Sequence, residues 1–201
     1  MSDQLISAIS SAKLPLAQGE FQITVYLEHE TGLEHVALQY GDVDCDQAIL
    51  LRLHSSCLTG DVFGSLRCDC GTQLQAALDQ IAKEGGLLLY MQQEGRGIGL
   101  ANKVKAYALQ DLGLDTVEAN QHLGFSDDLR DYKVAAEILK SIGVKKVKLL
   151  TNNPKKMSGL REAGIEIQSR EPIIISSQAH NLRYLSTKRD KLGHLLPKDA
   201  T

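Results

Sequence analysis

The sequence predicts one compact α+β domain in which antiparallel strands come first and alternating strand and helix units follow. Three observations carry this prediction. Short apolar runs rich in β-branched residues occupy the first part of the chain, helical stripes alternate with buried strands after it, and neither a repeat nor an obvious linker is present. A chain of 201 residues is long enough to bury a substantial core in such a domain.

The first expected elements are three strands. Residues 21–29, 35–40 and 48–54 alternate or run apolar, and only short turns separate them. Because short connections usually join strands that lie next to each other, the three are predicted to be consecutive antiparallel neighbours.

Helices and strands alternate in the remainder of the domain. The first helix is indicated over 72–86, where Leu74, Leu78 and Ile81 share a face and two glycines end the pattern. The expected elements that follow are a buried strand at 87–91, helices at 98–113 and 131–143, a strand at 144–151, a short helix at 154–164 and a strand at 165–169. We therefore expect a domain over 1–172 and a polar, partly mobile C-terminal tail over 173–201.

The composition is that of a soluble globular protein and excludes several classes of function. Apolar residues make up 43% and charged residues 23% of the chain, and no run approaches the roughly 18 apolar residues that a membrane span needs. A net charge of -3 leaves no basic surface for a nucleic acid polymer. The first residues lack the features of a signal peptide, so a cytoplasmic location with reduced thiols is expected.

Three of the four cysteines lie close together. Cys57, Cys68 and Cys70 stand in a polar, turn-rich stretch, CLTGDVFGSLRCDC, which is unlike a core strand. In a reducing compartment such thiols suit a soft metal, and zinc is the usual one. The alternative is three buried thiols that pack as small apolar groups. The sequence favours one zinc ion per chain held by these cysteines.

The number of thiols also bears on what the zinc does. Structural zinc sites have four protein ligands, whereas catalytic sites have three and leave the fourth position to water. Cys45 lies in an acidic, turn-like stretch and is expected at the surface. His54 is close enough in sequence to be a fourth ligand or to support the ligands from behind. We favour an open zinc site that activates water.

Two loops have features of phosphate-binding sites. In QQEGRGIGL, residues 92–100, glycines let backbone N–H groups approach an anion at a helix N-terminus, and Arg96 adds a bidentate donor. In TNNPKK, residues 151–156, Asn153 suits the cap and Pro154 the first position of a helix. An ordinary tight turn and a solvated lysine pair are the alternatives. Two such loops after two strands together indicate a nucleotide phosphate.

A cluster of charged residues precedes the helix expected at 131–143. In GFSDDLRDY, residues 124–132, Ser126 or an aspartate such as Asp127 could cap this helix. Capping leaves Arg130 without a role. Tyr107, on the helix expected at 98–113, is either a packed ring or a hydroxyl that acts in the site.

Taken together, these segments resemble the GTP cyclohydrolase II family of riboflavin synthesis. The segments that carry the resemblance are RLHSSCLTGDVFGSLRCDCG, QQEGRGIGLANKVKAYALQD, DTVEANQHLGF, DLRDY and LLTNNPKK, and it extends in order over roughly residues 15–196. The length leaves no room for the butanone-phosphate synthase domain fused to some members. The resemblance is therefore to the stand-alone form, with residues 1–172 as the catalytic domain.

The resemblance implies an activity, two metals and a set of residues. Members of the family hydrolyse GTP to formate, pyrophosphate and 2,5-diamino-6-(5-phospho-ribosylamino)pyrimidin-4(3H)-one, with zinc and magnesium and usually as homodimers. The implied zinc ligands are Cys57, Cys68 and Cys70. The residues implied to contact GTP are Arg52, Leu53, His54, Ser55, Ser56, Gln73, Glu94, Gly95, Arg96, Thr116, Thr151 and Lys156. Asp128 is implied as general base, Arg130 as a nucleophile toward the α-phosphate, and Tyr107 as a catalytic hydroxyl.

Three points stay open at the level of the sequence. Ser56 stands where the family pattern has glutamate, and serine carries no charge. Arg130 stays protonated unless a base such as Asp128 removes its proton, so a clamp on the α-phosphate is the alternative to a nucleophile. The rival functions are a zinc-dependent purine nucleotide deaminase, whose H-x-E and P-C-x-x-C signature the sequence lacks, and a non-catalytic zinc-binding module.

Overall fold

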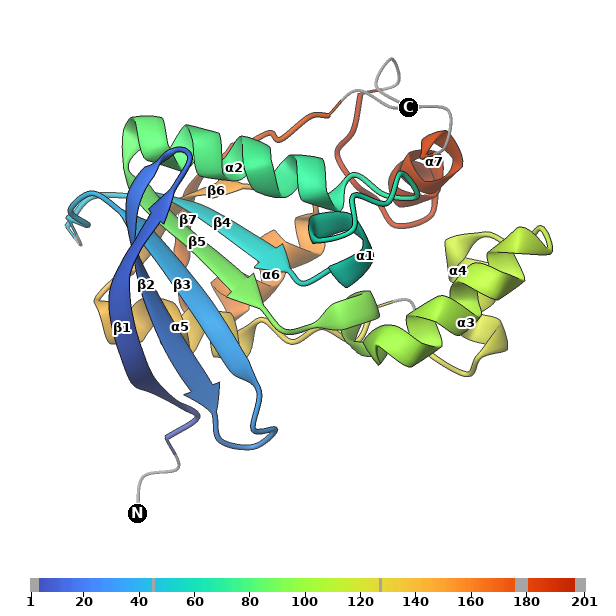
Figure 1. Ribbon diagram of the computed structural model, residues 1–201, viewed down its shortest axis with the longest axis horizontal. Coiled ribbons are helices and arrows are strands. Elements are labelled where there is room, and N and C mark those ends of the chain that lie inside the picture. Colours follow the sequence, from blue (N-terminus) through green and yellow to red (C-terminus); the bar gives the residue numbers. More distant parts are fainter. Residues whose placement is uncertain (1–3, 45, 127, 176–180, 198–201) are drawn as a thin grey trace.

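A computed structural model shows a seven-stranded mixed sheet with helices against both of its faces (Figure 1). The structure describes residues 4–44, 46–126, 128–175 and 181–197. The arrangement confirms the predicted α+β class, in which antiparallel strands precede alternating strands and helices.

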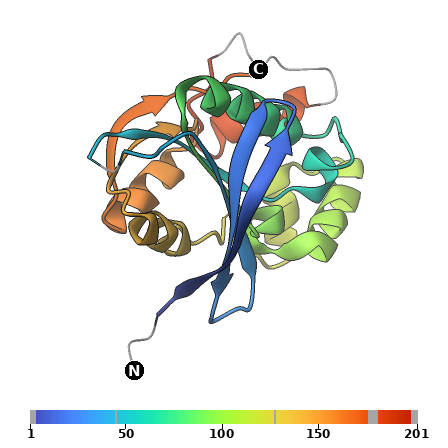
Figure 2. The ribbon, with the colours of Figure 1, turned by 60° about the vertical axis from the view of Figure 1, so that its left-hand side comes forward.

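The sheet changes from antiparallel to parallel pairing at its centre. Its strands are β1 (Ile6–Leu16), β2 (Gly19–Glu28), β3 (Glu34–Tyr40), β4 (Ile49–Ser55), β5 (Gly86–Met91), β6 (Lys146–Leu150) and β7 (Glu166–Glu171). Their spatial order is β1-β2-β3-β5-β4-β6-β7. β1 pairs with β2, β2 with β3 and β3 with β5 in antiparallel fashion. β5 pairs with β4, β4 with β6 and β6 with β7 in parallel. Figure 2 shows the hairpin of β1 and β2 as a long twisted ribbon that runs down the front of the molecule.

Helices lie on both faces of this sheet and also beyond the carboxyl ends of β4 and β5 (Figure 1). They are α1 (Leu58–Asp61), α2 (Cys70–Glu84), α3 (Gly99–Asp111), α4 (Thr116–His122), α5 (Lys133–Ile142), α6 (Pro154–Glu162) and α7 (Leu182–Asp190), with a 3-10 turn, η1, at Glu94–Gly97. One apolar core joins the sheet to α2, and a second joins it to α5 and α6. Within the described ranges no helix has the length and apolar character that crossing a bilayer requires.

Strands β4 and β5 lie between the two helical layers because apolar residues fill most of their positions. Leu51 and Leu89 pack in the core on the side of α5, and Leu50 and Leu88 pack in the core on the side of α2. A continuous apolar run of this kind is typical of a parallel strand covered on both faces. The close packing holds the carboxyl ends of these strands in fixed positions.

The prediction that residues 48–54 pair directly with 35–40 is wrong. β5 lies between β3 and β4, so β3 pairs with β5 in antiparallel fashion and β4 pairs with β5 and β6 in parallel. The leucine run of β4 needs cover on both faces, which the centre of the sheet provides. The antiparallel pairing predicted between β2 and β3 is confirmed.

Four elements are absent from the sequence prediction, namely β1, α1, α4 and α7. β1 is mostly exposed and therefore lacks the apolar alternation of a half-buried strand. α4 does carry a signal, a capping box in which Asp115 and Glu118 each accept from the other's backbone N–H. α7 falls in the range expected as a polar tail, of which residues 176–180 and 198–201 lie outside the described residues.

Candidate active site

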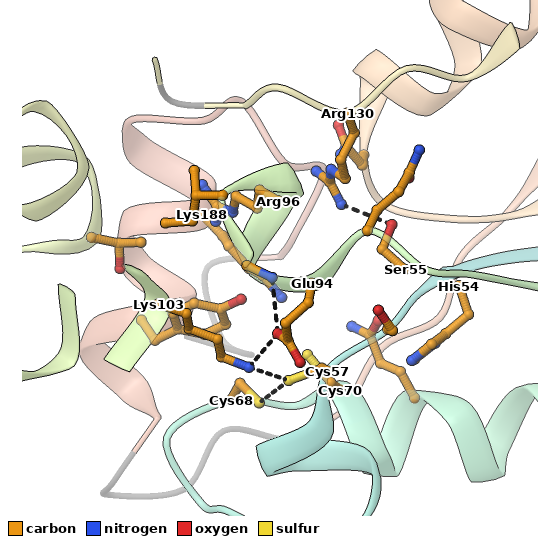
Figure 3. A pocket seen from close by; sticks show the side chains of 18 of the residues that line it. His54, Ser55, Cys57, Cys68, Cys70, Glu94, Arg96, Lys103, Arg130 and Lys188 are labelled. Atoms are coloured by element: carbon orange, nitrogen blue, oxygen red, sulfur yellow. Dashed lines mark hydrogen bonds and ion pairs between the residues drawn. The ribbon is translucent and has the colours of Figure 1, made fainter. Parts of the chain in front are cut away.

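The residues predicted for the site meet at the carboxyl ends of β4, β5 and β6. Cys57 follows β4, residues 92–97 follow β5, and residues 151–156 follow β6. Parallel strands end at the same edge of a sheet, which is where α/β folds bind ligands. Figure 3 shows this region, with the three cysteines at one side of a pocket and Arg130 at the other.

The pocket has a volume of about 1100 Å³, which includes solvent at its open mouth. The predicted residues that line it are Arg52, His54, Ser55, Ser56, Cys57, Cys68, Cys70, Gln73, Glu94, Gly95, Arg96, Tyr107, Thr116, Arg130, Thr151 and Lys156. Two predicted residues do not line it. Leu53 packs in the core, although its carbonyl oxygen accepts from Nζ of Lys156 at 2.7 Å. Asp128 lines a smaller pocket, whose wall also contains Arg96 and Arg130.

The three predicted metal ligands form a compact cluster of thiols. Their sulfurs lie within 4.8 Å of one another, and Sγ of Cys57 is 3.7 Å from Sγ of Cys68. Tetrahedral zinc with Zn–S bonds of about 2.3 Å separates two sulfurs by about 3.8 Å. A Cβ atom on Gly60 would lie 2.8 Å from Sγ of Cys68, so the absence of a side chain there lets the sulfurs come together.

The pKa values of the three thiols differ because their sulfurs interact. Hydrogen bonds from Cys68 and Cys70, joined by one from Lys103, lower the pKa of Cys57. The neighbouring Cys57 sulfur in turn raises the pKa of Cys68 to about 11 and that of Cys70 well above its usual range. Three thiolates therefore do not coexist here at neutral pH without added positive charge. A zinc ion supplies that charge, so the residues present fit one.

His54 supports the cysteine loop rather than joining the thiol cluster. Its Nε2 lies 3.0 Å from Oδ2 of Asp61, which also accepts from the Tyr90 hydroxyl and from the backbone N–H of Cys57, both at 2.9 Å. Burial lowers the pKa of His54, so the neutral ring donates its Nε2–H to Asp61. No further His, Cys, Asp or Glu of the described residues joins the three thiols, and Cys45 lies outside that part of the chain.

The turn η1 brings a strained arginine to the pocket. Arg96 has a φ of 63°, the one positive value among the described residues other than glycine. Such a conformation costs about 1–3 kcal/mol and is kept only where the surroundings enforce it. Glu94 provides part of that enforcement, because its carboxylate accepts from the backbone N–H of Leu58 at 2.7 Å and of Gly95 at 2.8 Å. The predicted phosphate loop is thereby tied to the cysteine loop.

Buried cationic side chains line the pocket from the neighbourhood of Cys70 to Arg130. Burial, together with the charges of Arg52, Arg130 and Lys188, lowers the pKa of Lys156 well below its usual range. Burial likewise lowers the pKa of Arg52 to about 10. Buried cations that repel one another in this way are stabilised by an anionic ligand. This part of the pocket is suited to a polyphosphate.

Asp128 and Arg130 form a bidentate ion pair. Nε of Arg130 lies 2.8 Å from Oδ1 and Nη2 lies 2.6 Å from Oδ2 of Asp128, while Nη1 lies 3.4 Å from Oγ of Ser55. Burial opposes both charges, yet the pairing lowers the pKa of Asp128 and raises that of Arg130. Oδ1 of Asp131 accepts from the N–H of Lys133, the first residue of α5, at 2.8 Å, whereas the N-cap residue of that helix is Tyr132, which makes no side-chain cap hydrogen bond. Asp127 lies outside the described residues.

The segment 151–156 has the helix start that the sequence predicts. Asn153 caps α6, its Oδ1 accepting from the N–H of Lys155 at 2.9 Å, and Pro154 is the first helical residue. Lys156 is buried in the pocket wall, so it is not part of a solvated lysine pair.

Tyr107 reaches the neighbourhood of the thiol cluster from α3. Its hydroxyl lies 3.3 Å from Oγ1 of Thr59, and that oxygen is 3.7 Å from Sγ of Cys57. The guanidinium of Arg67 lies 4.9 Å from the centroid of the Tyr107 ring. The tyrosine therefore lines the pocket and is not a packed core ring.

Several pocket residues have no counterpart in the sequence prediction of the site, among them Lys103, Tyr184, Lys188 and His194. Lys103 lies one helical turn before Tyr107, so a search for polar residues on the same helical face would find it. The other three come from the C-terminal segment, where only the tertiary structure shows that the chain returns to the pocket.

Comparison with known proteins agrees with the family resemblance in the motifs. A family model described as GTP cyclohydrolase II matches residues 7–172. A GTP cyclohydrolase-2 of Buchnera aphidicola subsp. Baizongia pistaciae is 55% identical over 194 residues, which cover 96% of this chain and 98% of the relative. A GTP cyclohydrolase-2 of Escherichia coli O9:H4 is also 55% identical, over 96% of this chain and 99% of the relative.

A solved structure gives a more distant match. It is RibBX, a two-domain 3,4-dihydroxy-2-butanone 4-phosphate synthase from A. baumannii, with a TM-score of 0.47 and 19% sequence identity. The match covers 84% of this chain, which spans 41% of the length of that structure's chain.

Proposed function

Because the chain belongs to the GTP cyclohydrolase II family, we propose that it hydrolyses GTP to formate, pyrophosphate and 2,5-diamino-6-(5-phospho-ribosylamino)pyrimidin-4(3H)-one, the first step of riboflavin biosynthesis. One observation supports this activity most directly. A single pocket contains a cluster of three thiols at one side and buried cations that extend from its neighbourhood to Arg130 at the other side. Ring opening and pyrophosphate release occur at opposite ends of GTP and need these two environments.

Cys57, Cys68 and Cys70 would hold one zinc ion per chain, with the fourth position open. When bound, zinc would supply a Lewis acid that activates water for hydrolysis of the substrate. Lys103 stabilises the ligand set, since its ammonium donates to Sγ of Cys57 at 3.1 Å. A magnesium ion would accompany the triphosphate, as polyphosphate substrates generally require.

The side chains at the cationic side would bind the triphosphate. Arg52, Lys156 and Arg96 line this part of the pocket, as do Thr151 and the backbone of Gly95. We assign Arg130 the role of a clamp on the α-phosphate, because its pairing with Asp128 favours the charged guanidinium. Asp128 would hold the guanidinium of Arg130 in place. It would also serve as the base if Arg130 had to lose a proton.

At the thiol side, Tyr107 is the proposed proton donor to the opening ring. Its hydroxyl lies beside Thr59 and near the cysteines, and burial raises its pKa, so the phenol keeps its proton at neutral pH. The guanine ring of GTP would be positioned by pocket residues near the thiols, namely His54, Ser55, Ser56, Gln73 and Thr116. Oγ of Ser56 is buried without a partner among the described residues, so an uncharged donor is available where the family pattern has glutamate. Glu94 would act by holding the phosphate loop against the cysteine loop.

The partner and location are also proposals. The cysteine loop exposes three apolar side chains, Val62, Phe63 and Leu66, by 66%, 72% and 51%. Arg67 of the same loop forms an ion pair at 2.5 Å with Asp111, and the neighbouring Leu112 is 80% exposed. An apolar surface of this kind supports a homodimer. Residues 1–172 are proposed to contain the catalytic groups, since the family match ends at residue 172, and the segment after them supplies part of the pocket wall. A site of free thiols requires a reducing compartment, which supports the cytoplasm.

The activity is tested by incubating the protein with GTP, magnesium and zinc and measuring formate, pyrophosphate and ammonia. We expect equal amounts of formate and pyrophosphate and no ammonia. Cys68→Ser should lose bound zinc and formate release together, whereas the matched control Cys45→Ser should keep both. Ammonia without formate would indicate a deaminase, and no product at all would indicate a zinc-binding module. Light scattering of the purified protein measures its mass in solution and so tests for the homodimer. Phe63→Asp places a charge on the exposed apolar surface and should shift the protein toward the monomer.

A further inference from the structure

A buried ion pair joins the C-terminal helix to the cysteine loop. Nζ of Lys188, on α7, lies 2.7 Å from Oδ1 of Asp69, and the two side chains are 10% and 2% exposed. The same ammonium lies 4.5 Å from the centroid of the Tyr184 ring. Tyr184, Lys188 and His194 all line the nucleotide pocket. The segment expected as a tail thus forms part of the pocket wall.

The carboxylate of Asp69 does not make the hydrogen bonds expected at its position in the helix. Asp69 is the N-cap residue of α2 and stands between Cys68 and Cys70, yet its carboxylate makes no capping hydrogen bond. Aspartate at this position normally stabilises the helix by accepting from its first N–H groups. Here Oδ1 accepts from Lys188, and Oδ2 accepts from Nε2 of Gln73 at 2.5 Å. The carboxylate is committed to tertiary contacts.

The contacts continue from Asp69 to an arginine of the pocket. Oε1 of Gln73 accepts from Nη2 of Arg52 at 2.7 Å, and Nη1 of Arg52 donates to the carbonyl of Leu150 at 3.0 Å. Asp69 fixes the orientation of the Gln73 amide, and the amide fixes the guanidinium. Nε of Arg52 is buried without a partner among the described residues. Arg52 also lines the pocket, so its guanidinium lies where a ligand would bind.

We propose that α7 is a working part of the nucleotide site and that Lys188 is a positioning residue, which acts through Asp69 and Gln73 to hold Arg52 ready for the nucleotide. The inference rests on the proposed function for the identity of the ligand, a guanosine triphosphate. Lys188 itself need not touch the nucleotide. Its ammonium anchors α7 and neutralises a carboxylate that lies between two metal-binding thiols.

Removing the ammonium should disturb both roles. In Lys188→Met the Asp69 carboxylate stays buried without its charged partner, which is far less favourable than losing the pair as a whole. Asp69 then has to move toward solvent, and Gln73 and Arg52 lose the geometry that it fixes. α7 loses its buried anchor at the same time. Lys188→Arg retains a cation and should retain most of the arrangement.

Two measurements on the zinc-loaded full chain test the proposal. Hydrogen exchange of the amides of α7 without nucleotide reports the anchor, and steady-state formate release at varied GTP reports KM and kcat. For Lys188→Met we expect exchange about tenfold faster and a KM about tenfold higher or more, with kcat changed much less. Lys188→Arg should have an exchange rate and a KM close to those of the unaltered protein. The control Arg189→Met removes a charge from the adjacent position, where the guanidinium pairs with Asp190, and should leave KM within about twofold.

Each other outcome is decisive. Faster exchange with an unchanged KM would make α7 a purely structural cover, and unchanged exchange would show that the ion pair does not anchor the helix. A melting temperature lowered to the same extent by Lys188→Met and Lys188→Arg, with equal KM values, would also overturn the positioning role. If the unaltered protein releases no formate from GTP, the proposed function fails, and hydrogen exchange still decides whether Lys188 anchors α7.

Discussion

The ammonium of Lys103 lies 3.1 Å from Sγ of Cys57 and 2.8 Å from Oε1 of Glu94, so one side chain connects the thiol cluster to the phosphate loop. Burial of Lys103 acts to lower its pKa, but the hydrogen bonds to Glu94 and Cys57 outweigh this effect and raise it. Lys103 therefore remains a cation at neutral pH. A permanent positive charge next to a thiolate lowers the cost of collecting three negative sulfurs in one place.

The first prediction concerns zinc retention. Lys103→Met keeps the length of the side chain but removes the donor to Cys57, and we expect zinc to bind about tenfold less tightly. Competition with a chromogenic chelator measures this affinity without substrate. Lys105→Met is the matched control, because Lys105 lies on the same helix and its hydrogen bond is to Asn102 at the surface. Equal zinc affinity in both variants would contradict the role of Lys103.

The second prediction separates the two halves of the reaction. Tyr107→Phe removes the hydroxyl beside Thr59 and keeps the ring under Arg67. We expect zinc content to stay normal and some pyrophosphate still to form, while formate falls by about 100-fold or more, as for loss of a general acid. Both products are measured in one reaction. Undiminished yields of both would show that the tyrosine acts only by packing.

The third prediction distinguishes the two roles of Arg130. A clamp forms no covalent bond, so rapid quenching during turnover should yield protein without an added guanylyl group. Intact-protein mass spectrometry makes this measurement, and a guanylyl adduct located on Arg130 would establish the nucleophile instead. Under either role Arg130→Ala should lower kcat/KM by about 100-fold, because a charge aimed at the phosphate is lost. The adduct alone therefore decides between them.

The fourth prediction concerns stability and pH. Burial, with the charges of Lys188 and Arg96 next in effect, lowers the pKa of His194 from its ordinary 6.5 to about 3. Between these two values the unfolded chain binds a proton at this position that the folded chain does not, so the free energy of unfolding falls as the pH is lowered below about 6.5. Urea denaturation of the nucleotide-free protein at pH 7, 6 and 5 measures the slope. His194→Asn should flatten it, and an unchanged slope would rule out this contribution.

The features that the sequence predicts well are those that lie within short segments. The spacing of Cys57, Cys68 and Cys70 places three thiols on one loop and the start of one helix, where their sulfurs lie within 4.8 Å of one another. The cap formed by Asn153 is likewise local. The capping box of Asp115 and Glu118 shows that a further local signal was available for α4.

The sequence by itself determined the fold class and the family, and it located the three clustered thiols and the two loops that border the pocket, because each is encoded in neighbouring residues. Only the tertiary structure decided which distant groups meet. β5 enters between β3 and β4 since the leucine run of β4 has to be covered on both faces. Arg130 faces Ser55 from 75 residues away, and Lys188 reaches Asp69 from 119 residues away. Such pairs depend on how the layers of the fold pack against each other. A charged side chain can interact with water as long as it is exposed, and it needs a specific protein partner only when it is buried.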